Sequence, residues 1–286
     1  MFLPRGKSSP VSGFTLIELS IVLVIIGLII GGVLVGQDMI RSAEERAQIS
    51  QIEKYNSAVN TFVGKYGALP GDMLATVGIQ FGFTQGVSCD GSAVGRRNGN
   101  GLIEGYMNGE IVVQGEGETA LFWEDLSSPI AGGFIDGSFA GASAPQAIVC
   151  NGIAVVLSST NLNLYFPLAK IGHGNYVYVY PYNSVNWYGV SAITSVNVNG
   201  EVFSGANISV KQAYDIDRKM DDGLPLSGKV QAIYVNSGPM LTPSQAPSGT
   251  SDTTGTCYNT ASGTYSISTS AGYGANGNCA LSFQFQ

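Results

Sequence analysis

The feature that most constrains this chain is an apolar segment of 22 residues near its N-terminus, from Phe14 to Val35. Within this segment only Thr15, Glu18 and Ser20 carry polar side chains. At about 1.5 Å of rise per residue, a helix of this length covers the roughly 30 Å hydrocarbon core of a bilayer. The sequence therefore predicts a membrane-spanning helix over residues 14–35 with one carboxylate inside it.

That carboxylate needs a partner, because an unpaired charge in hydrocarbon costs about 2.5–3.5 kcal/mol on insertion scales. Residues 1–13 carry only two charges, and the small residue Gly13 precedes the apolar run. In a secretory signal peptide the small-residue cleavage site follows the apolar core instead. A cut after Gly13 would leave the helix attached and create an amine on Phe14. This amine, on the same chain or on a neighbour, could then neutralise Glu18.

The run Gly13-Phe14-Thr15-Leu16-Ile17-Glu18, followed by a long apolar stretch, resembles the processing site of type IV prepilins and type II secretion pseudopilins. The resemblance implies cleavage by a prepilin peptidase, N-methylation of Phe14, and contact of Glu18 with the Phe14 amine of an adjacent subunit. The implied partners are copies of the chain, other pilins and an inner-membrane assembly platform. The alternative interpretation is an ordinary signal anchor with an incidental glutamate.

The helix is predicted to continue to Tyr66, because apolar residues between Gln37 and Tyr66 recur every three or four positions. Gly67 and Pro70 then supply a stop signal. Glycines in the apolar half predict bending or local melting around Gly31-Gly32. The predicted organisation is a leader (1–13), a long helix (14–66, transmembrane over 14–35) and an extracytoplasmic β-rich domain (67–286). The fold class is α+β, which the resemblance also implies.

Composition supports a loop-rich and β-rich domain, because 39 of 286 residues are glycine and only 12% are charged. Removing residues 1–13 leaves 11 basic against 20 acidic residues, a formal charge of −9. No basic cluster remains, so the sequence predicts no binding to nucleic acid.

Short runs beyond Gly67 predict the elements of this domain. Helices are predicted from Thr119 to Ser127 and from Ser209 to Asp222, each ahead of a proline. The polar stretch Ser237–Thr256 is predicted as an exposed loop. Strands are predicted where β-branched and aromatic residues gather: Ile148–Leu157, Asn161–Phe166, Tyr176–Tyr180, Val185–Val190, Ile193–Val198, Val230–Val235 and Leu281–Phe285.

Four cysteines lie far apart, with no Cys-x-x-Cys motif: Cys89, Cys150, Cys257 and Cys279. An even count outside the cytoplasm favours two disulfides over a metal site, and three pairings can be drawn. We favour Cys89–Cys150 with Cys257–Cys279, because each loop is then local. Pilins often fasten the C-terminal region with a disulfide, and this resemblance supports the second pair. Four free thiols are the alternative.

The densest acidic group is Asp217, Asp221 and Asp222, placed before Gly223. Such hard oxygen ligands can hold Ca²⁺, and the resemblance to major pseudopilins, which use a calcium site near the C-terminal loop, points the same way. The alternative is a helix end whose acids are solvated and paired with Arg218 and Lys219. No other cofactor is predicted.

Other polar groups are interpreted structurally. The spacing of asparagine and glycine in Asn98–Glu104 resembles that of a calcium-binding loop, but the residues at the ligand positions do not match. This mismatch favours an asparagine-glycine turn. His173 is the only histidine and is predicted to lie in a loop. The acids around the short helix are predicted to form its solvated face: Glu116, Glu118, Glu124 and Asp125.

The sequence thus predicts a structural filament subunit and not an enzyme. It is expected in the inner membrane before assembly and in an extracellular pilus or a periplasmic pseudopilus afterwards. Two alternatives stay open: a type II secretion pseudopilin, and a signal-anchored periplasmic enzyme or binding protein.

Overall fold

The computed structural model describes residues 13, 15–84, 97–107, 110–112, 117–139, 157–158, 162–196, 202–236 and 242–285. The chain divides into two compact units, Met1–Ala43 and Glu44–Gln286. The boundary between them falls inside the long helix α1 (Leu16–Tyr66).

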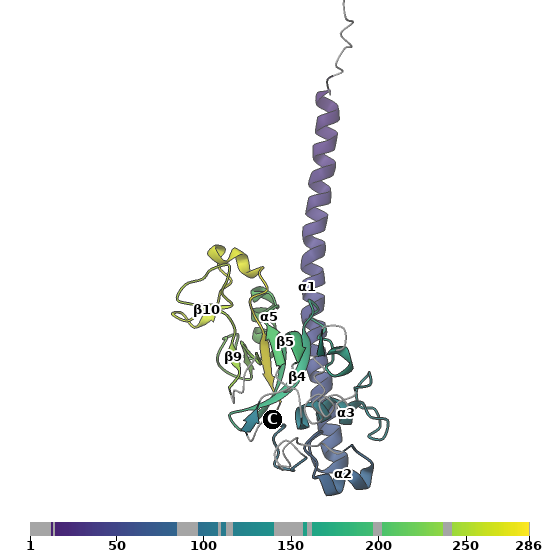
Figure 1. Ribbon diagram of the computed structural model, residues 1–286. Helices are drawn as coiled ribbons and strands as arrows, with labels where there is room; N and C mark the ends of the chain where they lie inside the picture. Colours follow the sequence, from purple (N-terminus) through teal and green to yellow (C-terminus); the bar gives the residue numbers. More distant parts are fainter. Residues whose placement is uncertain are drawn as a thin grey trace, which may run out of the picture. The chain divides into compact units, whose positions relative to one another are not determined.

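Helix α1 is unbroken over 51 residues (Figure 1). It passes through Gly31 and Gly32 without interruption, so the predicted local melting is wrong. Each glycine weakens a helix by about 1 kcal/mol. Glycine still has a backbone N–H and carbonyl, however, so the helical hydrogen bonds continue through both residues. The helix begins at Leu16, because Thr15 caps its first turn.

The part of α1 that belongs to the second unit is amphipathic, as its periodicity predicts. Ile52, Tyr55, Val59 and Phe62 are buried in the core of this unit. The charged side chains between them, such as Glu53, are exposed. This stripe is the face on which the domain packs.

Six strands in the described part of the chain form an antiparallel sheet (Figure 1). The path runs β3-β5-β13-β7, and β4 and β6 also pair with β5. In the register, Tyr188 on β5 lies opposite both Val179 on β4 and Phe283 on β13. The strands are β3 (Leu157–Ser158), β4 (Tyr176–Tyr182), β5 (Val185–Val196), β6 (Val202–Gly205), β7 (Val230–Gln231) and β13 (Leu281–Gln284).

Strand β5 corrects one prediction, since two strands were expected with a break at Ser191. This serine is buried inside one continuous strand. Its hydroxyl lies 3.0 Å from the Tyr178 hydroxyl and donates to the Ser204 hydroxyl at 2.8 Å. A polar residue can stay in the strand because its partners are supplied by β4 and β6.

Gly189 lies beneath the Tyr178 ring on the neighbouring strand. A Cβ added at Gly189 would lie 2.2 Å from Tyr178 Cε2. Glycine is therefore required here for close packing, and not for an unusual backbone conformation.

Two further strand predictions differ from the structure, and a third is largely untested. Asn161–Phe166 contains the 3₁₀ helix η1 (Leu162–Leu164), because Leu162 and Phe166 are buried four residues apart and the Phe166 N–H donates to the Leu162 carbonyl at 2.8 Å. Val230–Val235 is divided between β7 and the separate short strand β8 (Ile233–Tyr234). Most of the predicted strand Ile148–Leu157 lies outside the described residues.

The two predicted helices are confirmed, whereas the predicted loop 237–256 contains two short strands, β9 and β10. The described part of this stretch is mostly exposed, although Ala246 and Thr256 are buried. The remaining elements are α2 (Ala75–Phe81), β1 (Gly105–Met107), β2 (Glu110–Val112), α3 (Glu118–Ser127), α5 (Val210–Met220), β9 (Ser244–Gln245), β10 (Ser248–Gly249), β11 (Tyr258–Asn259), β12 (Thr264–Tyr265) and η2 (Thr269–Gly274).

Candidate functional site

The N-terminal apolar segment is exposed on every side. All described residues from Thr15 to Val35 are exposed within the chain. Among the described residues, α1 is the one helix long and apolar enough to cross a membrane. Gly13 is exposed with no atom within 4 Å of an added Cβ, and Phe14 lies outside the described residues.

Glu18 and Thr15 form a reciprocal capping box at the start of α1. The backbone N–H and the hydroxyl of Thr15 both donate to Glu18 Oε2 at 2.8 Å. The Glu18 N–H donates back to the Thr15 hydroxyl at 3.3 Å. Such a box satisfies backbone donors that the first helical turn leaves free. Sequence reasoning missed Thr15, although Thr-x-x-Glu ahead of an apolar run is a signal for it.

The capping box occupies only one oxygen of the Glu18 carboxylate. Among the described residues, no group donates to Glu18 Oε1. A cationic or amine donor can therefore reach this oxygen without displacing Thr15.

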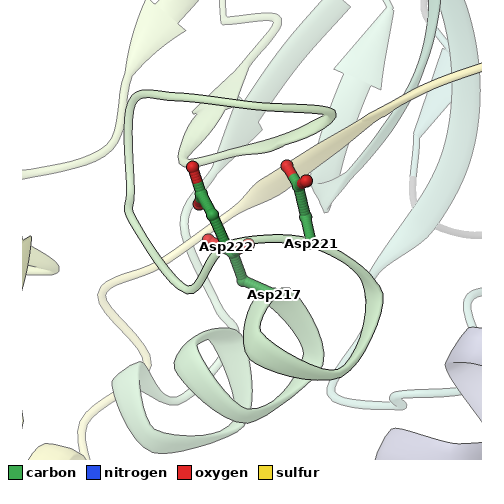
Figure 2. Close-up of side chains that lie close together, drawn as sticks. All are labelled: Asp217, Asp221 and Asp222. Atoms are coloured by element: carbon green, nitrogen blue, oxygen red, sulfur yellow. The ribbon is translucent and has the colours of Figure 1, made fainter.

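The predicted acidic group does come together at the end of α5 (Figure 2). One oxygen from each of Asp217, Asp221 and Asp222 lies within 4.8 Å of the other two. Asp217 is fully buried, Asp221 is partly buried and Asp222 is exposed.

Each of these carboxylates organises the loop that follows α5. Asp217 accepts from the Gly223 N–H at 3.2 Å and from the Tyr265 hydroxyl at 2.8 Å. Asp221 accepts from the N–H groups of Lys229 and Val230. The exposed Asp222 accepts from the Leu224 N–H at 2.8 Å and from the Ser227 hydroxyl at 2.6 Å. Burial raises the pKa of Asp217 to about 7.

This arrangement corrects the simpler alternative of solvated acids paired with basic neighbours. Asp217 is buried against Tyr265, and Lys219 forms its ion pair with Glu45 of α1 at 2.5 Å. The oxygen donors suit Ca²⁺ chemically, but three side chains supply only part of the six to eight ligands that it takes. Calcium at this group stays a prediction.

A second acidic cluster was missed from the sequence. Asp72, Glu104 and Glu118 are all buried, and their carboxylates hold residues 98–104. Asp72 accepts from the N–H groups of Gly99, Asn100 and Gly101 at 2.7–3.2 Å.

Glu118 and Glu104 complete the cluster. Glu118 accepts from the N–H groups of Asn98 and Glu104 at 2.9 and 3.0 Å. Glu104 accepts from the side-chain amides of Asn98 and Asn100. Burial, and after it the nearby charge of Asp72, raises the pKa of Glu118 to about 9. Burial also raises the pKa of Asp72.

A buried ion pair joins the same region to α3. Arg97 donates to both oxygens of Asp125 at 2.8 and 2.6 Å, and neither side chain is exposed by more than 1%. Asp125 also accepts from the Gly71 N–H at 2.7 Å. The Arg97 Nε–H donates to the Thr84 carbonyl, and the guanidinium lies 5.8 Å from the Phe83 ring centroid.

The prediction that the acids of α3 form a solvated face is therefore wrong for two of them. Glu118 and Asp125 are buried because loop donors and Arg97 compensate their carboxylates. Glu124 is partly exposed and accepts from the Thr84 hydroxyl at 2.6 Å, while Glu116 lies outside the described residues.

The asparagine-glycine turn is confirmed. Asn98 Oδ1 accepts from the Asn100 N–H, and Asn100 Oδ1 accepts from the Leu102 N–H. His173 lies in a loop, as predicted, with φ of 56° and its Nε2 3.9 Å from Glu44.

One predicted disulfide is present. Cys257 and Cys279 are bonded, with their Cα atoms 4.9 Å apart, and both are buried. The other predicted pair, Cys89 with Cys150, lies outside the described residues.

The comparisons with known proteins support the motif predicted in the N-terminal segment. Residues 9–34 match the prokaryotic N-terminal methylation motif. No curated protein and no solved structure gives a significant match to the chain. The family that the motif marks is structural and not enzymatic. This chain therefore carries the signature of the type IV pilins and pseudopilins.

Proposed function

We propose that the chain is a structural subunit of a type IV pilus-like filament, cut after Gly13 by a prepilin peptidase and N-methylated at Phe14. The observation that carries the proposal is the N-terminal segment itself. A methylation motif over residues 9–34 leads into a helix whose apolar side chains are all exposed as far as Val35. Such a surface is stable in a bilayer or against copies of the same segment, which are the two environments of a pilin.

In this proposal Glu18 uses its two oxygens for two partners. Thr15 of the same chain holds Oε2, so the carboxylate enters the membrane partly compensated. In the filament Oε1 receives the Phe14 amine of an adjacent subunit. The pairing fixes the register between neighbours, because only one axial offset brings the two groups together.

The decisive experiment is the intact mass and the N-terminal residue of the protein from membranes and from sheared surface material. A methylated Phe14 terminus in the sheared fraction is the expected result. An intact Met1 terminus with a monomeric protein in detergent would instead support a signal-anchored enzyme or binding protein.

Glu18→Ala tests the role of the carboxylate. We expect this variant to insert into the membrane normally but to be depleted from filaments by at least about tenfold, since a lost ion-pair contact of 1.4 kcal/mol already changes an equilibrium tenfold. Ser20→Ala is the matched control, because it removes a polar group from the same segment and should assemble normally. Normal incorporation of Glu18→Ala would contradict the proposed register contact.

The second candidate function is that of a type II secretion pseudopilin, and the acidic group at the end of α5 favours it. Oxygens of Asp217, Asp221 and Asp222 lie within 4.8 Å of each other, and a calcium ion would relieve their repulsion. Thermal unfolding with added Ca²⁺ and with a chelator tests this. A calcium-dependent midpoint together with a processed terminus found only in membranes would favour the pseudopilin. An unchanged midpoint would remove the argument for it.

A further inference from the structure

An open cleft of about 470 Å³ lies between helix α5 and the segments that follow β10 and β12, and we call it the C-terminal cleft. Its lining comes from three separate segments. Tyr214 and Arg218 belong to α5, Asp222 to the loop after α5, Asp252 to the loop between β10 and β11, and Ser268 to the turn before η2. The volume lies within the range of about 300–1,000 Å³ that small-molecule sites occupy.

The wall of this cleft is held in place by contacts within the fold. The rings of Tyr214 and Tyr265 meet edge to face, with their centroids 6.0 Å apart. The Tyr265 hydroxyl donates to the buried Asp217 at 2.8 Å. The disulfide between Cys257 and Cys279 closes the segment that carries β11, β12 and η2. A wall that is already formed loses little conformational entropy when a ligand binds.

Some polar groups in the cleft have hydrogen-bonding capacity left for a ligand. Asp252 Oδ1 accepts from the Asn259 side-chain amide at 3.1 Å, and among the described residues no group donates to Asp252 Oδ2. Within the described part of the chain, the Arg218 guanidinium and the Tyr214 hydroxyl have no hydrogen-bond partner. A carboxylate only accepts hydrogen bonds and a guanidinium only donates them. The ligand must therefore offer donors and acceptors close together.

This requirement selects the chemistry of the ligand. An ammonium group could donate to Asp252 but could not accept from Arg218, and a carboxylate or phosphate ligand would have the opposite defect and would also meet Asp222. A hydroxyl group donates and accepts. The remaining lining includes the partly exposed Tyr214 ring, whose negative face attracts polarised C–H groups. A sugar ring combines a rim of hydroxyls with such a C–H face.

We infer that the C-terminal cleft binds a neutral saccharide of one or two rings. Its hydroxyls donate to Asp252 and accept from Arg218, and one face of the ring lies against Tyr214. This inference goes beyond the proposed filament function, because it adds a ligand site to the unit Glu44–Gln286 and does not depend on assembly.

Saturation-transfer NMR with the full-length chain tests the inference. The protein is kept in a detergent without a sugar head group, so that the detergent does not compete. The probes are the methyl glycosides of glucose, galactose, mannose and N-acetylglucosamine, with N-acetylneuraminic acid as the anionic comparison. We expect at least one neutral probe to bind with a Kd on the order of 1 mM, the affinity usual for a ligand of this size. No transfer to any neutral probe, or equal transfer to N-acetylneuraminic acid, would overturn the inference.

Variants locate the bound sugar. Tyr214→Ala and Arg218→Ala each remove one of the proposed contacts and should weaken binding on the order of tenfold. Tyr273→Ala is the matched control, because this tyrosine is 70% exposed and does not line the cleft. It should bind like the wild type. Unchanged affinity in both cleft variants, or an equal loss in Tyr273→Ala, would mean that the sugar binds elsewhere and would overturn the inference.

Two further measurements keep these outcomes distinct. Arg218 is exposed, so Arg218→Ala should keep the wild-type midpoint of thermal unfolding and provides the test even if Tyr214→Ala is less stable. The N-terminal residue of the same preparation is determined separately. Processed chain that forms filaments but binds no neutral sugar would overturn this inference alone. Unprocessed chain that binds a neutral sugar in the cleft would instead refute the proposed filament function and support the inference.

Discussion

The segment Leu16–Val35 and the unit Glu44–Gln286 place their apolar and acidic side chains in opposite ways. In the segment the apolar side chains are exposed, and the single carboxylate is held by a residue three positions away. In the unit the apolar side chains are buried, and carboxylates such as Glu118, Asp125 and Asp217 are buried with them. The unit therefore buries its own apolar side chains and supplies partners for its own carboxylates. The exposed apolar surface of the segment instead needs a cover from outside the chain. This difference separates a unit that buries most of its own apolar side chains from a segment that leaves them exposed.

The largest expected loss of stability comes from removing the buried cation Arg97 from the unit. Arg97→Met leaves Asp125 buried without its cation, which costs about 3–5 kcal/mol for a broken buried pair. Thermal unfolding of the full chain in detergent, followed by tryptophan fluorescence, measures the loss. The exposed pair Lys54–Asp136 supplies the control, because Lys54→Ala should cost no more than about 1 kcal/mol. Similar losses for the two variants would mean that breaking the buried pair costs no more stability than breaking the exposed pair.

Gly189→Ala tests the packing of the sheet. The added Cβ would meet the Tyr178 ring at 2.2 Å, so we expect a loss of about 1–3 kcal/mol from overpacking. Gly205→Ala on β6 is the matched control, since no atom lies within 4 Å of its added Cβ. A midpoint for Gly189→Ala equal to that of Gly205→Ala would show that the Tyr178 ring can move aside.

The pH dependence of stability tests the buried acids. Glu118 has a folded pKa of about 9, above its ordinary value of 4.5, so the folded state holds a proton that the unfolded state releases. The free energy of unfolding should therefore fall as the pH rises from about 4.5 to about 9. Asp72, whose pKa burial also raises, adds to the same trend.

Glu118→Gln removes that titration and should flatten the decline in unfolding temperature between pH 5 and pH 9. The Asp72 contribution remains. The variant starts from a lower stability, because the N–H groups of Asn98 and Glu104 donate to two different oxygens of the Glu118 carboxyl group and an amide has only one oxygen. An unchanged slope in Glu118→Gln would mean that Glu118 stays ionised in the folded state.

The smallest effect is expected in the N-terminal segment. Thr15→Val keeps the shape of the side chain but removes the hydroxyl that caps α1, at a cost of about 1 kcal/mol of local helix stability. Amide hydrogen exchange at Glu18 should become faster, because its N–H donates to that hydroxyl. Thr15→Ser should keep the wild-type exchange rate. Equal rates in both variants would show that the capping box does not hold the first turn.

Local patterns predicted the longer helices and several strands of the main sheet, but not the polar contacts. The apolar run predicted the start of α1 to within two residues, the 3.6-residue period ahead of Gly67 predicted its end at Tyr66, and the β-formers around Tyr178 predicted β4. The sequence predicted two strands in place of β5, because a polar residue such as Ser191 usually interrupts a buried strand. In the structure the hydroxyls of Tyr178 and Ser204 supply its partners.

The candidate sites also differ in how far the sequence could predict them. Glu18 could be predicted because a carboxylate in an apolar run is conspicuous by itself. The partners of Arg97 and Glu118 could not, since Asp125 lies 28 residues from Arg97 and Asn98 lies 20 residues from Glu118. Burial of a charge depends on donors that only the folded chain brings near. For the same reason the acids after α5 were predicted as a group, while the contact of Asp217 with Tyr265 was not.

The carboxylate of Asp221 has a consequence for the outer edge of the main sheet. Among the described strands, β7 is the last in the order β3-β5-β13-β7, so one side of it is a sheet edge. Asp221 accepts from the N–H groups of Lys229 and Val230, and the Pro225 carbonyl accepts from Ala232. These contacts occupy donors that could otherwise recruit a strand from another molecule. The loop after α5 thus protects the domain against uncontrolled edge-to-edge aggregation.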